Sequence, residues 1–252
     1  MNRERILKLN EMLKLKKNTP TMGGILIVVA ILVPVVLLAD LSVFYVRMAL
    51  FCLFWLAALG GVDDYLKLTA SRRAGTRDGL RLWEKLVFQI ALGALLAVFV
   101  FNTGQDLAET ERFSDVGNVY SPYNVLSIPF YKGQPLGLYR GVLISLPVFW
   151  VLTILVIAGT SNAVNLTDGM DGLASGCMVL AAGVFMVLAT VVGDSDLCRT
   201  LLFMHVPRAG ELAVLCGAMV GACLGFLWFN AYPAQVFMGD TGSLPLGGLI
   251  GY

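Results

Sequence analysis

Long apolar stretches separated by short polar segments make up most of the chain. Six of them have the length of a helix that crosses a bilayer, about 17 to 25 residues; they cover residues 23–39, 42–62, 86–102, 142–159, 172–193 and 211–229. A seventh apolar stretch begins near Ser243 and is cut off at Tyr252. The pattern therefore predicts an all-α, polytopic membrane helix bundle with about seven transmembrane spans.

The composition supports this prediction. Hydrophobic residues make up 58% of the chain and charged residues 14%, with a mean hydropathy of +0.78, whereas a soluble domain carries about 25% charged residues. A net charge of +1 excludes a broadly basic nucleic-acid-binding protein, so we expect no nucleic-acid partner. The five cysteines lie mostly in apolar stretches without metal-like spacing, which predicts buried thiols and no disulfide framework.

The positions of lysine and arginine predict the orientation. Residues 1–22 hold six and residues 63–85 hold six more, while the connections 103–141 and 193–210 hold three and two. Because cytoplasmic loops carry the excess of positive charge, alternating crossings place the N-terminus in the cytoplasm.

Four polar clusters interrupt the apolar pattern, and alternating crossings put all of them on the cytoplasmic side. They are TPTMGG (19–24), GVDDYLK (61–67), SNAVNLTDGMDG (161–172) and NAYPAQVFMGDTGS (230–243). The carboxylates that we expect to converge there are Asp63, Asp64, Asp168, Asp171 and Asp240. Taken alone, the TPTMGG cluster is interpreted as structural.

Carboxylates at the ends of membrane helices repel one another and are costly, so a positive partner is required. Magnesium prefers oxygen ligands and is typically held by one or two carboxylates together with substrate phosphates. Lys16, Lys67 and Lys85 belong to the same cytoplasmic set and could hold phosphate oxygens. The combination predicts a site for a metal–diphosphate complex.

The spacing inside the clusters leaves alternatives open. Asp63 and Asp64 point about 100° apart on a helix, so we expect different roles for them, one with a metal or a lysine and the other as a base or as the residue that orients a nucleophile. Asp240, flanked by Gly239 and Gly242, is the best candidate for a metal ligand, and a simple N-cap of the seventh span is the alternative.

The third cluster repeats its polar residues every three positions, at Asn162, Asn165, Asp168 and Asp171. If helical, these residues share a face. The N-terminus of the next span, which begins near residue 172, could bind an anion or the edge of a base. The alternative is that they only cap the helix.

Together the four clusters resemble one family, the polyprenyl-phosphate sugar-1-phosphate transferases. TPTMGG, DDYLK, NAVNLTDGMDGLA and FNAYPAQVFMGDTGSLPLGG carry this resemblance, which runs from about Lys16 to the last residue. The closest match is to the branch that transfers phospho-N-acetylmuramoyl-pentapeptide from UDP-MurNAc-pentapeptide to undecaprenyl phosphate, giving lipid I and UMP in peptidoglycan synthesis. The resemblance implies a multi-pass protein of the bacterial cytoplasmic membrane, dependence on Mg²⁺, an active site facing the cytoplasm and a homodimer.

The resemblance also implies roles for individual residues. Asp240 corresponds to the magnesium ligand, and Asp63 and Asp64 correspond to an essential pair, one of which deprotonates the lipid phosphate or acts as nucleophile. We favour direct attack by the lipid phosphate with Asp63 as the acid–base residue, and a covalent aspartyl intermediate is the alternative.

The remaining correspondences concern substrate binding. They place Asn165, Asp168 and Asp171 around the uridine diphosphate end, Asn230 in the loop before the metal ligand, and Lys16 and Lys67 near the nucleotide and phosphates.

We expect residues 1–252 to be a single integral membrane transferase domain, incomplete at the C-terminus and also at the N-terminus. The family has a further helix before TPTMGG and a histidine-rich cytoplasmic loop after the MGDTGS span, and neither is present here. The nearest rival is a sister transferase that uses UDP-N-acetylglucosamine. A secondary transporter is a weaker alternative, because it would hold its carboxylates near the bilayer midplane, often in repeated halves.

Overall fold

The computed structural model describes residues 19–70, 79–110, 125–126, 135–136, 139–140, 142–201, 203 and 205–252. Helices dominate these residues, as the apolar pattern predicts. They are α2 (Gly24–Leu38), α3 (Phe44–Ala70), α4 (Leu82–Thr110), α5 (Leu146–Thr167), α6 (Leu173–Gly193), α7 (Ser195–Leu201), α8 (Glu211–Asn230) and α9 (Asp240–Gly251). Four two-residue strands lie between α4 and α5 and form two small antiparallel pairs: β1 (Val125–Leu126) with β4 (Val142–Leu143), and β2 (Pro135–Leu136) with β3 (Tyr139–Arg140).

Each of the seven predicted apolar stretches contains a helix, although the fourth begins with strand β4 and becomes helical only at Leu146. Within the described residues, α3, α4, α5, α6 and α8 are long and apolar enough to cross a membrane, and α2 is a shorter apolar helix. The predicted all-α membrane bundle is therefore confirmed.

Two helices continue further than the hydropathy pattern predicts. The second apolar stretch was expected to end at residue 62, but α3 continues to Ala70, and α5 runs to Thr167 instead of stopping at residue 159. The added turns contain Asp63, Asp64 and Asn165, whose side chains bond to other helices. Because these polar groups find partners inside the bundle, the helices continue past the apolar residues.

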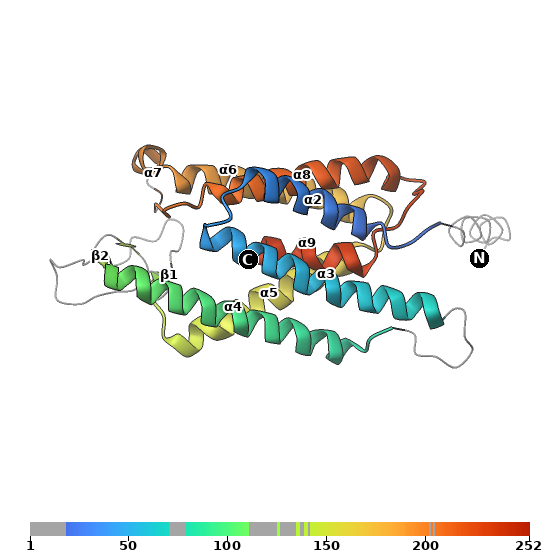
Figure 1. The fold of residues 1–252 in the computed structure, drawn as a ribbon, viewed down its shortest axis with the longest axis horizontal. Helices are drawn as coiled ribbons and strands as arrows, with labels where there is room; N and C mark the ends of the chain where they lie inside the picture. The colour runs from blue at the N-terminus through green and yellow to red at the C-terminus, as the bar shows by residue number, and fades with distance from the viewer. Residues whose placement is uncertain are drawn as a thin grey trace, which may run out of the picture.

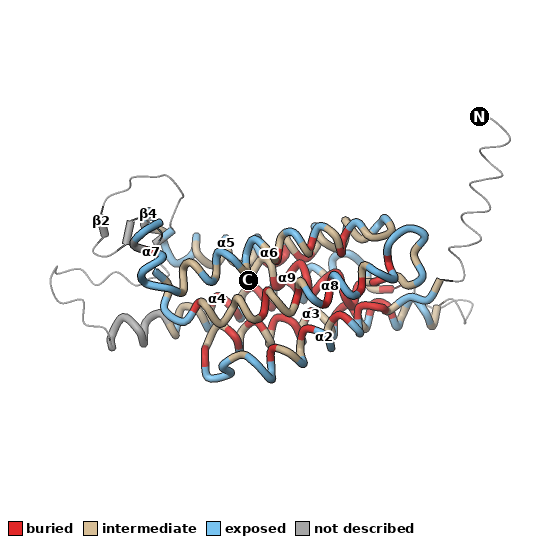
Figure 2. The backbone as a smooth tube through the Cα atoms, turned by 90° about the horizontal axis from the view of Figure 1, so that it is seen from above, coloured by how far each residue is buried: buried red, intermediate tan, exposed pale blue. Residues whose placement is uncertain are grey.

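The helices form two layers with α9 between them (Figure 1). One layer contains α2, α6 and α8, and the other contains α3, α4 and α5; α9 contacts α2 and α6 of the first layer and α3 and α5 of the second. All residues of α9 from Asp240 to Leu249 are buried. Figure 2 shows buried residues concentrated on the inner faces of the bundle, while large apolar side chains such as Leu37, Leu180 and Trp228 are exposed on the outside. This distribution fits a bundle surrounded by lipid.

Glycines allow the backbone of α9 to approach its neighbours on three sides. A Cβ atom added to Gly24 of α2 would lie 2.1 Å from the amide nitrogen of Gly242, and one on Gly60 of α3 would lie 2.1 Å from the carbonyl oxygen of Asp240. A Cβ on Gly247 would lie 2.4 Å from the carbonyl oxygen of Thr160 in α5. Small residues at helix contacts permit this close packing in membrane proteins, so the position of α9 is set by direct contact with three helices.

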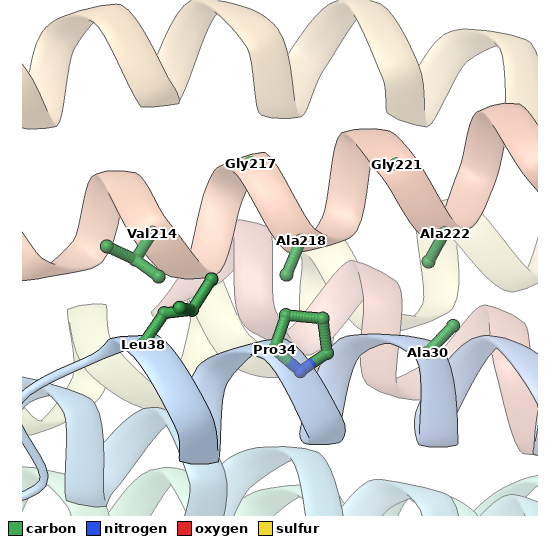
Figure 3. Close-up of a pocket in the computed structure, with 8 residues that line it drawn as sticks. All are labelled: Ala30, Pro34, Leu38, Val214, Gly217, Ala218, Gly221 and Ala222. Atoms are coloured by element: carbon green, nitrogen blue, oxygen red, sulfur yellow. The ribbon is translucent and has the colours of Figure 1, made fainter.

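The contact between α2 and α8 is looser. An apolar groove runs between them, lined by Ala30, Pro34, Leu38, Val214, Gly217, Ala218, Gly221 and Ala222 (Figure 3). The side chains of both helices that line this groove are all apolar.

Candidate active site at the start of helix α9

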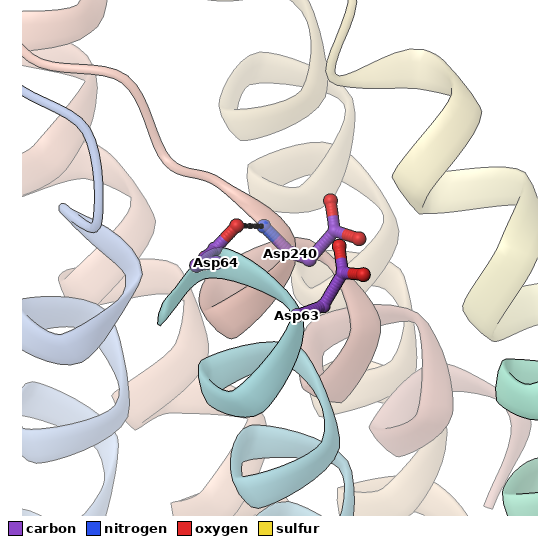
Figure 4. Close-up of side chains that lie close together, drawn as sticks. All are labelled: Asp63, Asp64 and Asp240. Atoms are coloured by element: carbon purple, nitrogen blue, oxygen red, sulfur yellow. Dashed lines mark hydrogen bonds between the residues drawn. The ribbon is translucent and has the colours of Figure 1, made fainter. Parts of the chain in front are cut away.

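Three carboxylates meet where the cytoplasmic-side clusters were expected to converge. Asp63 and Asp64 lie in α3, and Asp240 is the first residue of α9 (Figure 4). One carboxylate oxygen from each lies within 4.8 Å of the others. The residues are 0%, 6% and 9% exposed, respectively. Carboxylates so close and so buried require cations or hydrogen-bond donors to compensate their charge.

Asp63 obtains its compensation from two lysines. Its Oδ2 lies 2.6 Å from Nζ of Lys67, one turn further along α3, and 2.8 Å from Nζ of Lys85 in α4. Its Oδ1 accepts a hydrogen bond of 2.6 Å from the backbone N–H of Leu80, just before α4. Asp63 therefore joins the end of α3 to the beginning of α4.

Asp240 shares the same lysines. Its Oδ2 forms a close ion pair with Lys85 and lies 3.3 Å from Nζ of Lys67. Its Oδ1 accepts a hydrogen bond of 2.9 Å from the side-chain amide of Asn165 in α5, which also bonds to Ser243 at 2.9 Å. The side chain of Lys85 is 12% exposed and that of Lys67 is 45% exposed, so Lys85 is the more enclosed counter-ion.

Asp64 has different partners. Its Oδ1 accepts a hydrogen bond from the backbone N–H of Asp240 at 3.2 Å, and its Oδ2 accepts bonds from the backbone N–H and hydroxyl of Thr241 at 2.9 and 2.7 Å. The neighbouring aspartates therefore face different groups, in agreement with the helical angle between them.

Asp168 follows the last residue of α5 and lies close to the same group. Its pKa is raised to about 7, mainly by burial and additionally by the carboxylates of Asp240 and Asp64, while a hydrogen bond from the backbone of Gly239 acts in the opposite direction. Asp168 thus adds a fourth carboxyl group beside the cluster, and the negative charge of the cluster contributes to its raised pKa.

The other predicted residues have hydrogen-bond partners that differ from those of the carboxylate cluster. Asp171 accepts a 3.3 Å bond from the N–H of Ala234. Asn230 is 2% exposed, accepts bonds from Gly172 N–H and Ser175 Oγ, and donates to the carbonyl oxygen of Val236. Both residues hold the loop before α9, and their contact with substrate stays a prediction. Lys16 lies outside the described residues.

The TPTMGG cluster fixes this loop from the other side. The N–H of Phe237 donates to Pro20, and the N–H groups of Gly23 and Gly24 donate to the carbonyl oxygens of Phe237 and Met238, all at 2.8 to 2.9 Å. These bonds are made by the backbone, in keeping with the structural interpretation of this cluster.

Sequence reasoning missed a buried polar contact between α4 and α5. Gln89 is fully buried, donates to Ser161 Oγ at 3.1 Å and accepts a 2.7 Å bond from Asn162. Gln89 lies one turn after Lys85 in α4, and its partner Asn162 lies one turn before Asn165 in α5. The contact is therefore one helical turn away from two residues of the candidate site. Gln89 is a polar residue near the beginning of the apolar stretch 86–102, and a polar side chain inside such a stretch is a signal of function that could have identified it.

The three carboxylates can hold a metal ion. Their oxygens match the preference of hard divalent cations for carboxylate ligands. Asp63 and Asp240 are the better placed pair, because their Oδ2 atoms form ion pairs with lysine ammonium groups among the described residues, whereas Asp64 is bonded to the backbone of α9.

The fold and the site together define a class: a multi-pass helical membrane protein with buried carboxylates and lysines grouped at one end of its bundle. Comparison with known proteins is more specific. Residues 46–252 match the model of glycosyl transferase family 4, so the chain belongs to this family. Residues 16–28 match signature 1 of phospho-N-acetylmuramoyl-pentapeptide-transferase.

Similar proteins carry the same name as the signature. The chain is 42% identical over 245 residues to a phospho-N-acetylmuramoyl-pentapeptide-transferase of Koribacter versatilis (strain Ellin345), covering 94% of this chain and 60% of the relative. Proteins of that name from Thermodesulfovibrio yellowstonii (strain ATCC 51303 / DSM 11347 / YP87) and Desulfatibacillum aliphaticivorans are each 42% identical, over 238 and 237 residues, with 94% of this chain and 58% of each relative covered. The chain thus spans about 60% of the length of these relatives.

Proposed function

We propose that this protein transfers phospho-N-acetylmuramoyl-pentapeptide from its UDP conjugate to undecaprenyl phosphate, releasing UMP and forming lipid I. The observation that carries the proposal is the convergence of Asp63, Asp240, Lys67 and Lys85 at one point in a chain that matches the signature of such transferases. The names of the relatives support the muramoyl substrate over its N-acetylglucosamine counterpart.

The reaction exchanges one phosphoric anhydride for another. An oxygen of the lipid phosphate forms a bond to the sugar-linked phosphorus, and the bond from that phosphorus to the oxygen of UMP breaks. Little driving force is needed, so positioning and charge neutralisation supply most of the acceleration. The site contains the required groups, because Lys67 and Lys85 can neutralise phosphate oxygens and Asn165 fixes the orientation of Asp240.

Magnesium is the cation that we assign to the carboxylates, with Asp240 as a ligand and Asp63 beside it. When bound, Mg²⁺ would supply positive charge against the diphosphate and the leaving UMP. Asp63 and Asp240 would then be neutralised without the lysines, and the ammonium groups of Lys67 and Lys85 become available for phosphate oxygens. Asp63 remains beside the phosphates as the proposed acceptor of the lipid phosphate proton.

The membrane supplies the second substrate. We propose that the end of the bundle with the three carboxylates faces the cytoplasm of a bacterium, as the lysine and arginine counts indicate. The lipid phosphate would reach the site from the inner leaflet, and the water-soluble nucleotide from the cytoplasm.

The test measures UMP release by membranes carrying the complete reading frame, supplied with undecaprenyl phosphate, Mg²⁺ and one of two UDP sugars. We expect release with UDP-MurNAc-pentapeptide, and none with UDP-N-acetylglucosamine or with EDTA. Asp240→Ala should lower the rate by about 1,000-fold or more, because charge stabilisation at the reacting phosphates is lost. UMP release with UDP-N-acetylglucosamine alone would show that the protein has the activity of the sister transferase. No release from folded protein with either UDP sugar would refute the proposal.

A further inference from the structure

The beginning of α9 has no local capping group. The residue before the helix is Gly239, at φ 73° and ψ 176°, and it has no side chain that could accept from the first N–H groups of α9. A Cβ atom at this position would lie 2.6 Å from Oδ2 of Asp64. The backbone angle and the available space both exclude the serine, threonine or aspartate that usually caps a helix.

Asp64 provides the missing acceptors from another helix. It lies 176 positions away from Asp240 in the chain, and its two oxygens accept from the N–H groups of Asp240 and Thr241. The hydroxyl of Thr241 adds a third bond at 2.7 Å. A negative charge at this end of a helix is also stabilised by the helix dipole.

The neighbouring Asp63 differs in the kind of partner that it has. Its Oδ2 faces lysine side chains, and one of them, Lys67, is 45% exposed and can move to a phosphate. The partners of Asp64 are backbone groups of a buried helix, which cannot leave without unwinding the first turn of α9. Asp64 is therefore bound to α9 by both of its oxygens, while Asp63 keeps the backbone N–H of Leu80 on Oδ1 and can exchange the lysine partners of its Oδ2.

We propose that Asp64 is a positioning residue that caps α9 and thereby fixes Asp240, and that it takes no part in proton transfer or nucleophilic attack. The proposal rests on the proposed function and assigns separate roles to the two aspartates of that site. Asp63 contacts the reacting groups, whereas Asp64 acts through the first turn of α9.

The experiment compares Asp64→Asn, Asp64→Ala and Asp63→Asn in the complete protein in membranes. Two quantities are measured: the rate of UMP release, and hydrogen–deuterium exchange of the backbone amides at the start of α9. Asparagine caps helices about as well as aspartate, and its oxygen can still accept from Thr241. We therefore expect Asp64→Asn to keep activity within about tenfold of the wild type and Asp64→Ala to lose about 100-fold or more. Exchange at Asp240 and Thr241 should be faster in Asp64→Ala.

Asp63→Asn provides the contrast, because it should lose activity without faster exchange in α9. Thr241→Val, with Thr241→Ser as its matched control, removes one of the three donors to Asp64 and should weaken protection in the same amides. Loss of activity in both Asp64 variants with exchange at wild-type rates would overturn the proposal and assign Asp64 to the chemistry. The exchange measurement needs no substrate, so it stands even if the wild type releases no UMP from the muramoyl nucleotide.

Discussion

At the scale of single residues, the candidate site contains three carboxylates and two ammonium groups. Asp63 and Asp240 share Lys67 and Lys85, and the third carboxylate, Asp64, is compensated by helix amides. The site therefore carries its own counter-ions, and a substrate phosphate or a cation must compete with internal ion pairs.

Lys85 contributes to both stability and activity. Replacement by Met removes the more enclosed ammonium group from two buried carboxylates, which we expect to lower the free energy of unfolding by about 2 to 4 kcal/mol. UMP release should fall by about 100-fold or more, since a charge against the phosphates is lost. Thermal unfolding in detergent and the UMP assay measure the two effects.

Lys67→Met is the matched control, because the exposure of Lys67 makes its ion pairs worth at most about 1 kcal/mol. It should lose activity with little change in the unfolding temperature. Equal unfolding temperatures for the Lys85 and Lys67 variants would contradict this assignment of roles.

Individual residues also show what sequence could and could not predict. The aspartates, Asn165 and Lys67 stood out because charged and amide groups are costly beside apolar stretches. The partners of Asp64 could not be predicted, because the hydrogen bonds join residues 176 and 177 positions apart. The sequence indicated only that adjacent aspartates point in different directions.

At the scale of helices, the contact between α3 and α9 places Asp63 and Asp64 beside Asp240. Gly60, one turn before Asp64, lies directly against the carbonyl of Asp240. The next residue, Gly61, has only the hydroxyl oxygen of Thr241 within contact distance of a Cβ, at 3.9 Å. Neighbouring glycines of one helix therefore differ sharply in the space around them.

Gly60→Ala and Gly61→Ala test this contact as a matched pair. An added methyl at residue 60 would collide with backbone that cannot move away, so α3 and α9 must separate; we expect a loss of about 2 to 3 kcal/mol and strongly reduced UMP release. At residue 61 the methyl fits, and alanine is a better helix former than glycine by about 1 kcal/mol. Similar unfolding temperatures and activities for the two variants would show that the contact is looser than described.

Helix boundaries were harder to predict than the helices themselves. Hydropathy located all seven apolar stretches, since the bilayer selects for length and apolar character. It placed the end of α3 too early, because it cannot recognise that the polar residues after residue 62 are satisfied by α4 and α9. Nor does hydropathy distinguish α9, which protein surrounds, from the helices with exposed apolar faces.

At the scale of the whole molecule, the length of α3 relates the site to the membrane. Its 27 residues correspond to about 40 Å, compared with about 30 Å for the hydrocarbon core. Either one end of α3 projects beyond the hydrocarbon core, or the whole helix is tilted within it. The polar residues after Gly61 make the end with the carboxylates the one that reaches the aqueous phase.

Chemical labelling of introduced cysteines tests the orientation. Met170, between α5 and α6, is 68% exposed at the end of the bundle with the carboxylates, and Ser42, between α2 and α3, is exposed at the opposite end. In intact cells, we expect a membrane-impermeant maleimide to label Ser42→Cys but not Met170→Cys, and to label both after lysis. Both cysteine variants should be made in a protein that also carries Cys177→Ser, since Cys177 is an exposed native thiol that could itself be labelled. Labelling of Met170→Cys in intact cells would place the site on the outer side.

The loop from Ala231 to Gly239 is held on both sides, by the side chain of Asn230 and by the backbone of residues 20–24. Each residue of a helix turns the chain by about 100°, so one extra residue in this loop would either break those bonds or enter α9 and rotate Asp240 away from Lys85. Side chains here can be exchanged as long as these bonds survive, but the number of residues cannot change. Insertions and deletions, more than substitutions, are the changes that this segment cannot accommodate.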